Sequence, residues 1–392
     1  MSPDSWLPPR GVLLHIGPRK TGTTALQSAI AAARPELRQQ GIIYPGKVAR
    51  HIQAAGAVQQ RSLIGMARGE KADMSVWDDL VAEVAERDDK AIVSSENFGS
   101  AVPDIIPKII NDLGGPQVKV LITIRPIGEM LPSLWQQKIK GGQTIRFDDW
   151  LAKQLKGNYK QEMWHAQRHD QLVQRWVDVA GADSVAVMPV VSARRDDLYR
   201  NFEDLVGITP GLLKPTRSNR SLTASEAELL RELHERIDLQ RTDPQLYHRW
   251  VRQGAFKSLV ERRTPSKDDP KVVLPRWAAE RALEIEEMML PGIANSGAHI
   301  VGDLNDLIPA LPQVDEAAEI VAPPTSVDND VAIELFVGLL EKANKQSQRD
   351  AKKSRRRLRK SKGNLTKMST AEMVSEIARR GKAKATSVVK KD

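Results

Sequence analysis

The sequence contains no cysteine, which excludes disulfide bonds, thiolate metal sites and a cysteine nucleophile. It also lacks any apolar run near the roughly 20 residues that a membrane-spanning helix requires. The first ten residues do not show the basic and then apolar order of a signal peptide. We therefore expect a cytoplasmic protein, for which a peripheral contact with the inner face of the membrane remains open.

Histidines are scarce, with seven in 392 residues. The one pair at helical spacing, His165 and His169, lacks the glutamate of the His-Glu-x-x-His zinc motif. The sequence therefore predicts that both are solvated helix residues and that the chain binds no metal ion. His15 lies inside an apolar run and is expected to be a core histidine.

The charge of the chain is concentrated at one end. The net charge is +9, but residues 341–392 hold 18 Lys and Arg against 5 Asp and Glu, a net of +13, whereas residues 1–340 carry a net of −4. A stretch rich in Pro, Ala and acidic residues, 311–328, precedes this end. We expect one α/β domain over 1–310, a linker over 311–328, and a helix with a basic, disordered tail over 329–392.

The most informative stretch lies near the N-terminus. Apolar Val12–Ile16 leads into Gly17-Pro18-Arg19-Lys20-Thr21-Gly22, and an Ala- and Leu-rich segment follows, which predicts a strand, a tight loop and a helix. The N–H groups of such a loop and the helix N-terminus attract an anion. Nucleotide-triphosphate loops place a lysine after the second glycine, but here Thr23 stands there and Lys20 lies in mid-loop. We call Gly17–Gly22 the phosphate loop.

Two further strand-type segments follow, Lys90–Asn97 and Val118–Pro126, with helical patterns between them. This alternation predicts an α/β fold, a P-loop-type three-layer sandwich with a central, mostly parallel sheet, plus a helical C-terminal extension. Parallel strands end at one edge of the sheet, where ligands bind. Glu96 and Arg125 should therefore lie near the phosphate loop.

The run from His15 to Thr24 resembles the 5′-phosphosulfate-binding loop of sulfotransferases that use 3′-phosphoadenosine 5′-phosphosulfate (PAPS). In that family the loop lysine stands two residues before Gly-Thr-Thr, as Lys20 does, and contacts the 5′-phosphate and the sulfuryl group. The resemblance implies a cofactor-binding set of Gly17, Arg19, Lys20, Thr21, Gly22, Thr23 and Thr24.

Arg125 and Ser133 match, in type and spacing, the pair that binds the 3′-phosphate in this family. A planar multidentate donor with a hydroxyl suits a phosphate dianion, and this phosphate distinguishes PAPS from ATP. Arg217 and Asn219 lie in a segment that corresponds to a late loop folding over the nucleotide in similar enzymes. A solvated loop with two arginines is the alternative.

Transfer of a sulfuryl group to an alcohol needs a base for the hydroxyl proton. Ser94-Ser95-Glu96 resembles bacterial members in which a glutamate at this strand end is that base. His51 competes for the role, because similar proteins often carry a histidine after the Tyr-Pro segment. For Glu96, the alternative is a carboxylate paired with Lys20 or Arg125 or left solvated.

The resemblance implies an enzyme that moves the sulfuryl group of PAPS to a hydroxyl, less readily an amine, of a small molecule, glycolipid or glycan. Two alternatives remain open: a P-loop kinase that phosphorylates small molecules, and a noncatalytic phosphate-loop protein that anchors an assembly through its tail. From Glu341 onward the tail has no aromatic residue for base stacking, which favours an anionic membrane surface or polymer over nucleic acid. Neither the acceptor nor the oligomeric state follows from the sequence.

Overall fold

The computed structural model describes residues 5–62, 70–86, 88–156, 164, 167–215, 220–237, 244–309, 311 and 329–365. The chain divides into two compact units. The first comprises Met1–Gln245 and Thr264–Asp328, and the second comprises Leu246–Arg263 and Asn329–Asp392. The junction between Asp328 and Asn329 coincides with a predicted boundary, but Leu246–Arg263, placed in the domain over 1–310 by the sequence, are grouped with the C-terminal helix.

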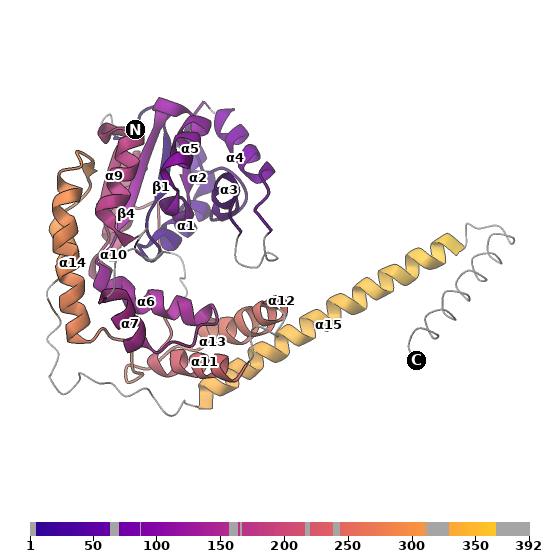
Figure 1. Cartoon of the computed structure of the whole chain (residues 1–392). Helices are drawn as coiled ribbons and strands as arrows, with labels where there is room; N and C mark the ends of the chain where they lie inside the picture. The colour runs from indigo at the N-terminus through magenta and orange to yellow at the C-terminus, as the bar shows by residue number, and fades with distance from the viewer. Residues whose placement is uncertain are drawn as a thin grey trace. The chain divides into compact units, whose positions relative to one another are not determined.

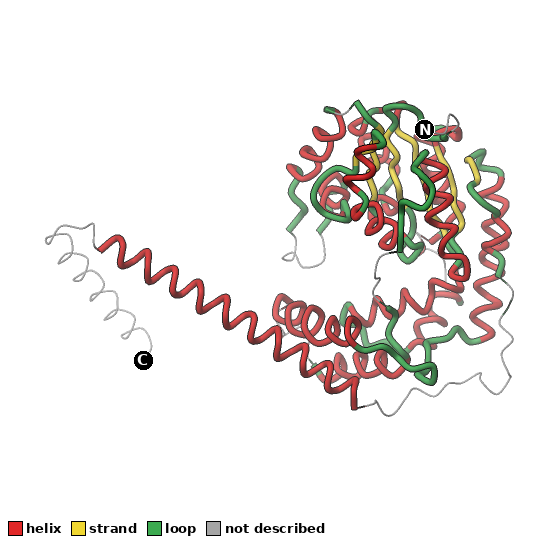
Figure 2. The backbone as a smooth tube through the Cα atoms, turned by 180° about the vertical axis from the view of Figure 1, so that it is seen from behind, coloured by secondary structure: helices red, strands yellow, loops and turns green. Residues whose placement is uncertain are grey.

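The first unit contains a six-stranded parallel sheet (Figure 1, Figure 2). In spatial order the strands are β2 (Ile42–Ile43), β3 (Lys90–Ser94), β1 (Val12–Ile16), β4 (Val118–Ile124), β5 (Val185–Pro189) and β6 (His299–Ile300). The predicted α/β class with a central parallel sheet is confirmed.

Two apolar cores cover the two faces of the sheet, as the alternation of side chains along a strand requires. Val12, Leu14 and Ile16 face one core, and Leu13 faces the other. The first core is closed by α3 (Ile52–Val58), α4 (Ser75–Ala85), α5 (Ile106–Leu113) and α9 (His169–Ala180). The second is closed by α1 (Thr23–Ala32), α2 (Arg34–Gln39) and α10 (Arg195–Val206). The result is a three-layer sandwich.

Strand β1 lies at the centre of the sheet, between β3 and β4. The chain builds the β2 and β3 side first and the β4, β5 and β6 side afterwards. The carboxyl end of β1 therefore lies where the strand order changes direction, which is where open α/β sheets bind their ligands. The phosphate loop begins at this point.

Four further helices of the first unit are α6 (Ile127–Lys140), α7 (Phe147–Leu155), α11 (Ala224–Arg236) and α14 (Arg276–Ala294). Helix α14 packs against α6, α7 and α9. One contact in this group corrects a prediction. His169 was expected to be solvated, but its side chain is fully buried, with Nδ1 3.2 Å from Oε1 of Glu286. The other oxygen of Glu286 accepts a hydrogen bond from the N–H of Ile127 at 3.1 Å. His165 lies outside the described residues.

The described part of the second unit is helical. A π-helix (η6, His248–Phe256) continues into α13 (Lys257–Arg262), and both pack against α15 (Asn329–Leu365). The 37 residues of α15 form one helix, which extends into the basic part of the chain that was predicted to be disordered. Among the described residues, none of the helices is both long enough and apolar enough to cross a membrane.

Candidate functional site

The phosphate loop joins β1 to α1 and depends on two glycines. A Cβ atom on Gly17 would lie 2.4 Å from the carbonyl oxygen of Thr123, so no larger residue fits. Gly22 has φ 82°, a left-handed conformation that glycine adopts without strain, and it is the N-cap of α1. No side chain caps α1. The N–H of Ala25 already donates to the carbonyl of Gly22 at 3.0 Å, so the N–H groups of Thr23 and Thr24 are the ones at this helix end that can bind an anion.

Lys20 occupies the middle of the loop with φ 77°, an unusual backbone angle for a residue other than glycine. Its side chain is exposed, yet the protein atoms around it lower the pKa of Lys20 by partial desolvation. The Glu96 carboxylate opposes this shift, whereas Arg125 and Arg19 lower the pKa further. Four charged groups thus influence one another at the mouth of the loop.

Thr21, predicted to be a cofactor contact, is fully buried. Its hydroxyl donates a hydrogen bond to the carbonyl of Pro18 at 2.9 Å and lies 3.1 Å from Oγ1 of Thr123. This side chain therefore shapes the loop from the interior of the protein.

A buried polar network supports the loop from below. Nδ1 of His15 lies 2.8 Å from Oγ of Ser94, and Nε2 lies 3.2 Å from Oγ1 of Thr123. The side-chain amide of Gln27 donates to the same Ser94 oxygen at 3.0 Å. Burial lowers the pKa of His15 to about 3, so the ring is neutral. His15 is a core histidine, as predicted, and it links the central strands beneath the loop.

Glu96 follows β3 on the other side of the loop. The predicted strand extended to Asn97, but β3 ends at Ser94 and Glu96 begins a 3-10 turn (η1, Glu96–Ser100). The half-buried Glu96 carboxylate accepts a hydrogen bond from Oγ1 of Thr23, 3.1 Å away. A Cβ on Gly99 would lie 2.7 Å from the carbonyl oxygen of Gly17, so this turn packs directly on the loop backbone. The carboxylate is thereby held beside the N-terminus of α1.

Arg125 follows β4 and holds three parts of the site together. Its guanidinium donates to Glu129 Oε2 at 2.8 Å, to the carbonyl of Lys20 at 3.2 Å and to the hydroxyl of Ser192. Glu129 was not predicted as a site residue, although its i,i+4 spacing from Arg125 indicates an ion pair. Ser133 lies one turn beyond Glu129 on the same face of α6 and is half-buried.

His51 is buried, with 4% of its surface exposed. Its Nδ1 accepts a hydrogen bond from the N–H of Ser94 at 3.0 Å, and Nε2 lies 2.9 Å from the carbonyl oxygen of Pro45, to which it donates. Burial, the largest influence, lowers the pKa of His51. Both ring nitrogens thus serve to join the Pro45 segment to β3.

The remaining predicted residues lie at the rim or outside the described residues. Arg19 and Thr24 are exposed beside the loop. Arg217 and Asn219 fall in the range 216–219, which the structure does not describe. Within the described ranges, no three His, Asp or Glu side chains gather in a group that could hold a metal ion.

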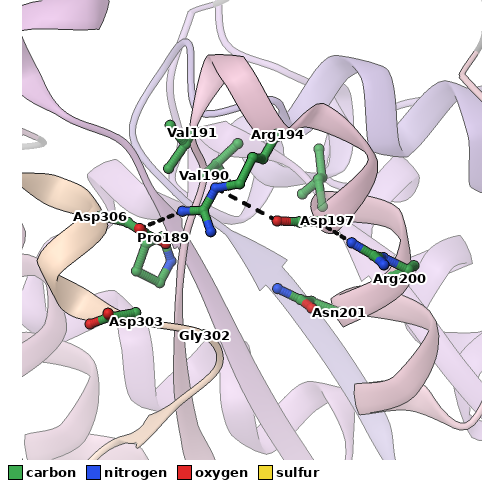
Figure 3. A pocket seen from close by; sticks show the side chains of 11 residues that line it. Pro189, Val190, Val191, Arg194, Asp197, Arg200, Asn201, Gly302, Asp303 and Asp306 are labelled. Carbon is green, nitrogen blue, oxygen red and sulfur yellow. Dashed lines mark hydrogen bonds and ion pairs between the residues drawn. The ribbon is translucent and has the colours of Figure 1, made fainter. Parts of the chain in front are cut away.

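A cavity of about 320 Å³ lies next to the loop, between the end of β5, α10 and the segment Gly302–Asp306 (Figure 3). Val190 and Leu198 line it and also approach the Cα of Gly22, because a Cβ there would lie 3.5 and 3.0 Å from them. Arg194 also lines the cavity and forms ion pairs with Asp306 and Asp197, two further lining residues. The volume of the cavity is within the range of small-molecule binding sites.

Comparison with known proteins gives a distant likeness in structure. No family model matches the chain, and no curated protein matches it. Among solved structures, the chain is similar to the crystal structure of a sulfotransferase from Alicyclobacillus acidocaldarius, with 18% identity over 58% of this chain and 96% of that chain, and a TM-score of 0.37. A similarity this distant carries no conclusion about the activity of the present chain.

Proposed function

We propose that this protein is a sulfotransferase that moves the sulfuryl group of PAPS to a hydroxyl group of a small molecule, glycolipid or glycan. One observation carries the proposal: Lys20, Arg125 and Glu96 surround a single uncapped helix N-terminus. A cation in mid-loop, a second cation and a carboxylate are the groups that this transfer requires.

The loop suits the 5′-phosphosulfate end of PAPS. The backbone N–H groups of Thr23 and Thr24 and the hydroxyl of Thr24 would bind it, with Arg19 at the rim, while the single hydroxyl proton of Thr23 is donated to Glu96. Arg125 would bind the 3′-phosphate together with Ser133. Three interactions already occupy the Arg125 guanidinium, which has five N–H donors, so donors remain for a phosphate. The cavity beside Gly22 would hold part of the nucleoside.

In the proposed reaction, PAPS supplies the sulfuryl group. The acceptor oxygen forms a bond to sulfur while the bond between sulfur and the bridging phosphate oxygen breaks. Glu96 takes the hydroxyl proton, and Thr23 orients the Glu96 carboxylate through its hydrogen bond. The Lys20 ammonium stabilises the negative charge that develops on the bridging oxygen of the departing 3′-phosphoadenosine 5′-phosphate (PAP).

Glu96 is a better candidate for the base than His51. A base needs a free lone pair facing the acceptor, but the Nδ1 lone pair of His51 accepts the Ser94 N–H and its Nε2 proton is donated to Pro45. Protonation of His51 would break a buried hydrogen bond. The Glu96 carboxylate accepts one hydrogen bond and keeps further lone pairs.

The kinase alternative is less well supported, because Thr23 stands at the lysine position of the nucleotide-triphosphate loop and β4 leads into Arg125 rather than an aspartate. Thermal unfolding in PAP, PAPS and Mg-ATP separates the alternatives. A ligand at 100 times its Kd should add roughly 2.7 kcal/mol to the free energy of unfolding. We expect stabilisation by PAP and PAPS and little by Mg-ATP. Stabilisation by Mg-ATP alone would favour a kinase, and binding of PAPS without transfer to any acceptor would favour the noncatalytic protein.

A further inference from the structure

Helix α15 presents two different faces. One face packs on the η6 helix, where Val331 is buried and a Cβ on Gly338 would lie 2.6 Å from the carbonyl oxygen of Gly254. The other face exposes three large apolar side chains, Ile333, Phe336 and Leu340, with 58%, 66% and 69% of their surfaces accessible. Their i, i+3, i+7 spacing aligns them along one side of the helix. We call these three residues the apolar stripe.

The same helix is strongly basic beyond the stripe. From Lys342 to Leu365 it holds 11 Lys and Arg and a single acidic residue, Asp350. Arg349, Lys352 and Lys353 are exposed. An exposed apolar stripe thus continues, within one helix, into a segment of concentrated positive charge.

We propose that α15 docks on an anionic lipid surface. The apolar stripe would enter the boundary between headgroups and acyl chains, and the basic segment would contact anionic headgroups. The combination favours lipid over the other occupants. A soluble polyanion would satisfy the charge but leave the stripe in water. A second copy aligned in parallel would bring two basic segments together, and the stripe covers only about two helical turns, too short for a stable coiled coil.

The inference does not depend on the proposed sulfuryl transfer, because all the residues involved belong to the second unit. The test is co-sedimentation of the full-length protein with vesicles, one set zwitterionic and one with about 30% anionic lipid, at about 0.1 M salt. We expect binding to the anionic set alone and release at high salt.

Three variants test the two parts of the surface. Ile333→Ser/Phe336→Ser/Leu340→Ser should weaken binding at least about tenfold, since it removes the groups that enter the lipid. Arg349→Gln/Lys352→Gln/Lys353→Gln should weaken it by about 100-fold at low salt. The matched control is Val273→Ser/Met288→Ser, which removes two exposed apolar side chains from the first unit and should bind as the wild type does.

Other outcomes would overturn the proposal. Failure of the wild-type protein to bind anionic vesicles would contradict it. Normal binding by the apolar-stripe variant would also contradict it, because charge alone would then explain the contact. If light scattering shows that the wild type is a dimer and the apolar-stripe variant a monomer, the apolar stripe binds a second copy of the chain instead. Unchanged thermal unfolding of each variant controls for folding.

Discussion

At the scale of single residues, Lys20 carries the most specific expectation. Lys20→Ala should lower the rate of sulfuryl transfer by about 10² to 10³, because one donor to the developing charge is lost. PAP affinity should change much less. Single-turnover kinetics and PAP titration measure the two effects separately. Lys47→Ala, at an exposed lysine outside the phosphate loop, is the control, and wild-type turnover in Lys20→Ala would remove the assigned role.

The lowered pKa of Lys20 gives this expectation a pH dependence. The ammonium is lost at a lower pH than in an ordinary lysine, so turnover should fall as the pH rises through that lowered pKa. In Lys20→Arg the guanidinium stays protonated, so the alkaline fall should move to higher pH. A profile with the same alkaline limb in both proteins would assign that limb to another group.

Glu96 and His51 should respond to substitution in opposite ways. Glu96→Gln should reduce the rate with an alcohol acceptor by about 10² to 10⁴ and leave PAP affinity nearly unchanged. His51→Ala should instead lower the free energy of unfolding by about 1–3 kcal/mol, since a buried N–H and a buried carbonyl lose their partner. A glutamine variant with full turnover, beside an inactive but folded alanine variant, would make His51 the base.

The buried His15 predicts how stability depends on pH. Its pKa is about 3 in the folded protein and about 6.5 when unfolded, so the unfolded state binds the extra proton between these values. The free energy of unfolding should therefore fall as the pH drops from about 6.5, with this group contributing up to ~1.4 kcal/mol per pH unit. The free energy of unfolding, measured by urea titration at several pH values in this window, should depend less steeply on pH in His15→Gln than in the wild type. His299→Gln, at an exposed histidine, is the control.

At the scale of elements, the corner between β4 and α6 should decide which nucleotide binds. Arg125→Ala should weaken binding of PAP far more than binding of adenosine 5′-phosphate, because only PAP has the 3′-phosphate. Glu129→Gln keeps an acceptor for Arg125 but removes a negative charge near that phosphate, so PAP should bind more tightly. Calorimetric titration of both nucleotides tests this, and equal losses for both in Arg125→Ala would contradict it.

The sequence predicted the elements well where the pattern is local. The predicted strand, tight loop and helix near the N-terminus are present as β1, the phosphate loop and α1. A second helix, α2, follows α1 directly, and Pro35 stands near its start. Because parallel strands end at one edge of the sheet, Glu96 and Arg125 were predicted to lie near the phosphate loop. Arg125 donates to the carbonyl of Lys20 in the loop, and Glu96 accepts from Thr23 directly after it.

What the sequence could not predict depends on partners far apart in the chain. His169 meets Glu286 across 117 residues, and no local pattern marks either as buried. The burial of His51, a candidate base in the sequence, has a similar origin, since its partners belong to a different strand and turn. The roles of the site residues in binding and transfer remain predictions.

At the scale of the whole molecule, the second unit limits where the chain can be shortened. Glu341 pairs with Arg262, so a cut before Glu341 removes part of the packing of α15. A chain that ends at Asp350 keeps that pair and loses most of the basic segment. It should retain PAPS turnover with a soluble acceptor while its binding to anionic vesicles falls at least about 100-fold at low salt. Loss of PAP binding on this cut would show that the removed residues support the first unit.

The hydrogen bond from Ile127 to Glu286 bears on how the protein is made. The two residues are 159 positions apart, so at about 5–20 residues per second the ribosome needs roughly 8–30 s to deliver the carboxylate after the N–H. Until then the N–H of Ile127, the first residue of α6 and close to Arg125 in the chain, lacks its native acceptor. A nascent chain stalled within this interval should therefore be more open to protease around α6 than the finished protein, and the nucleotide site should mature only late in translation.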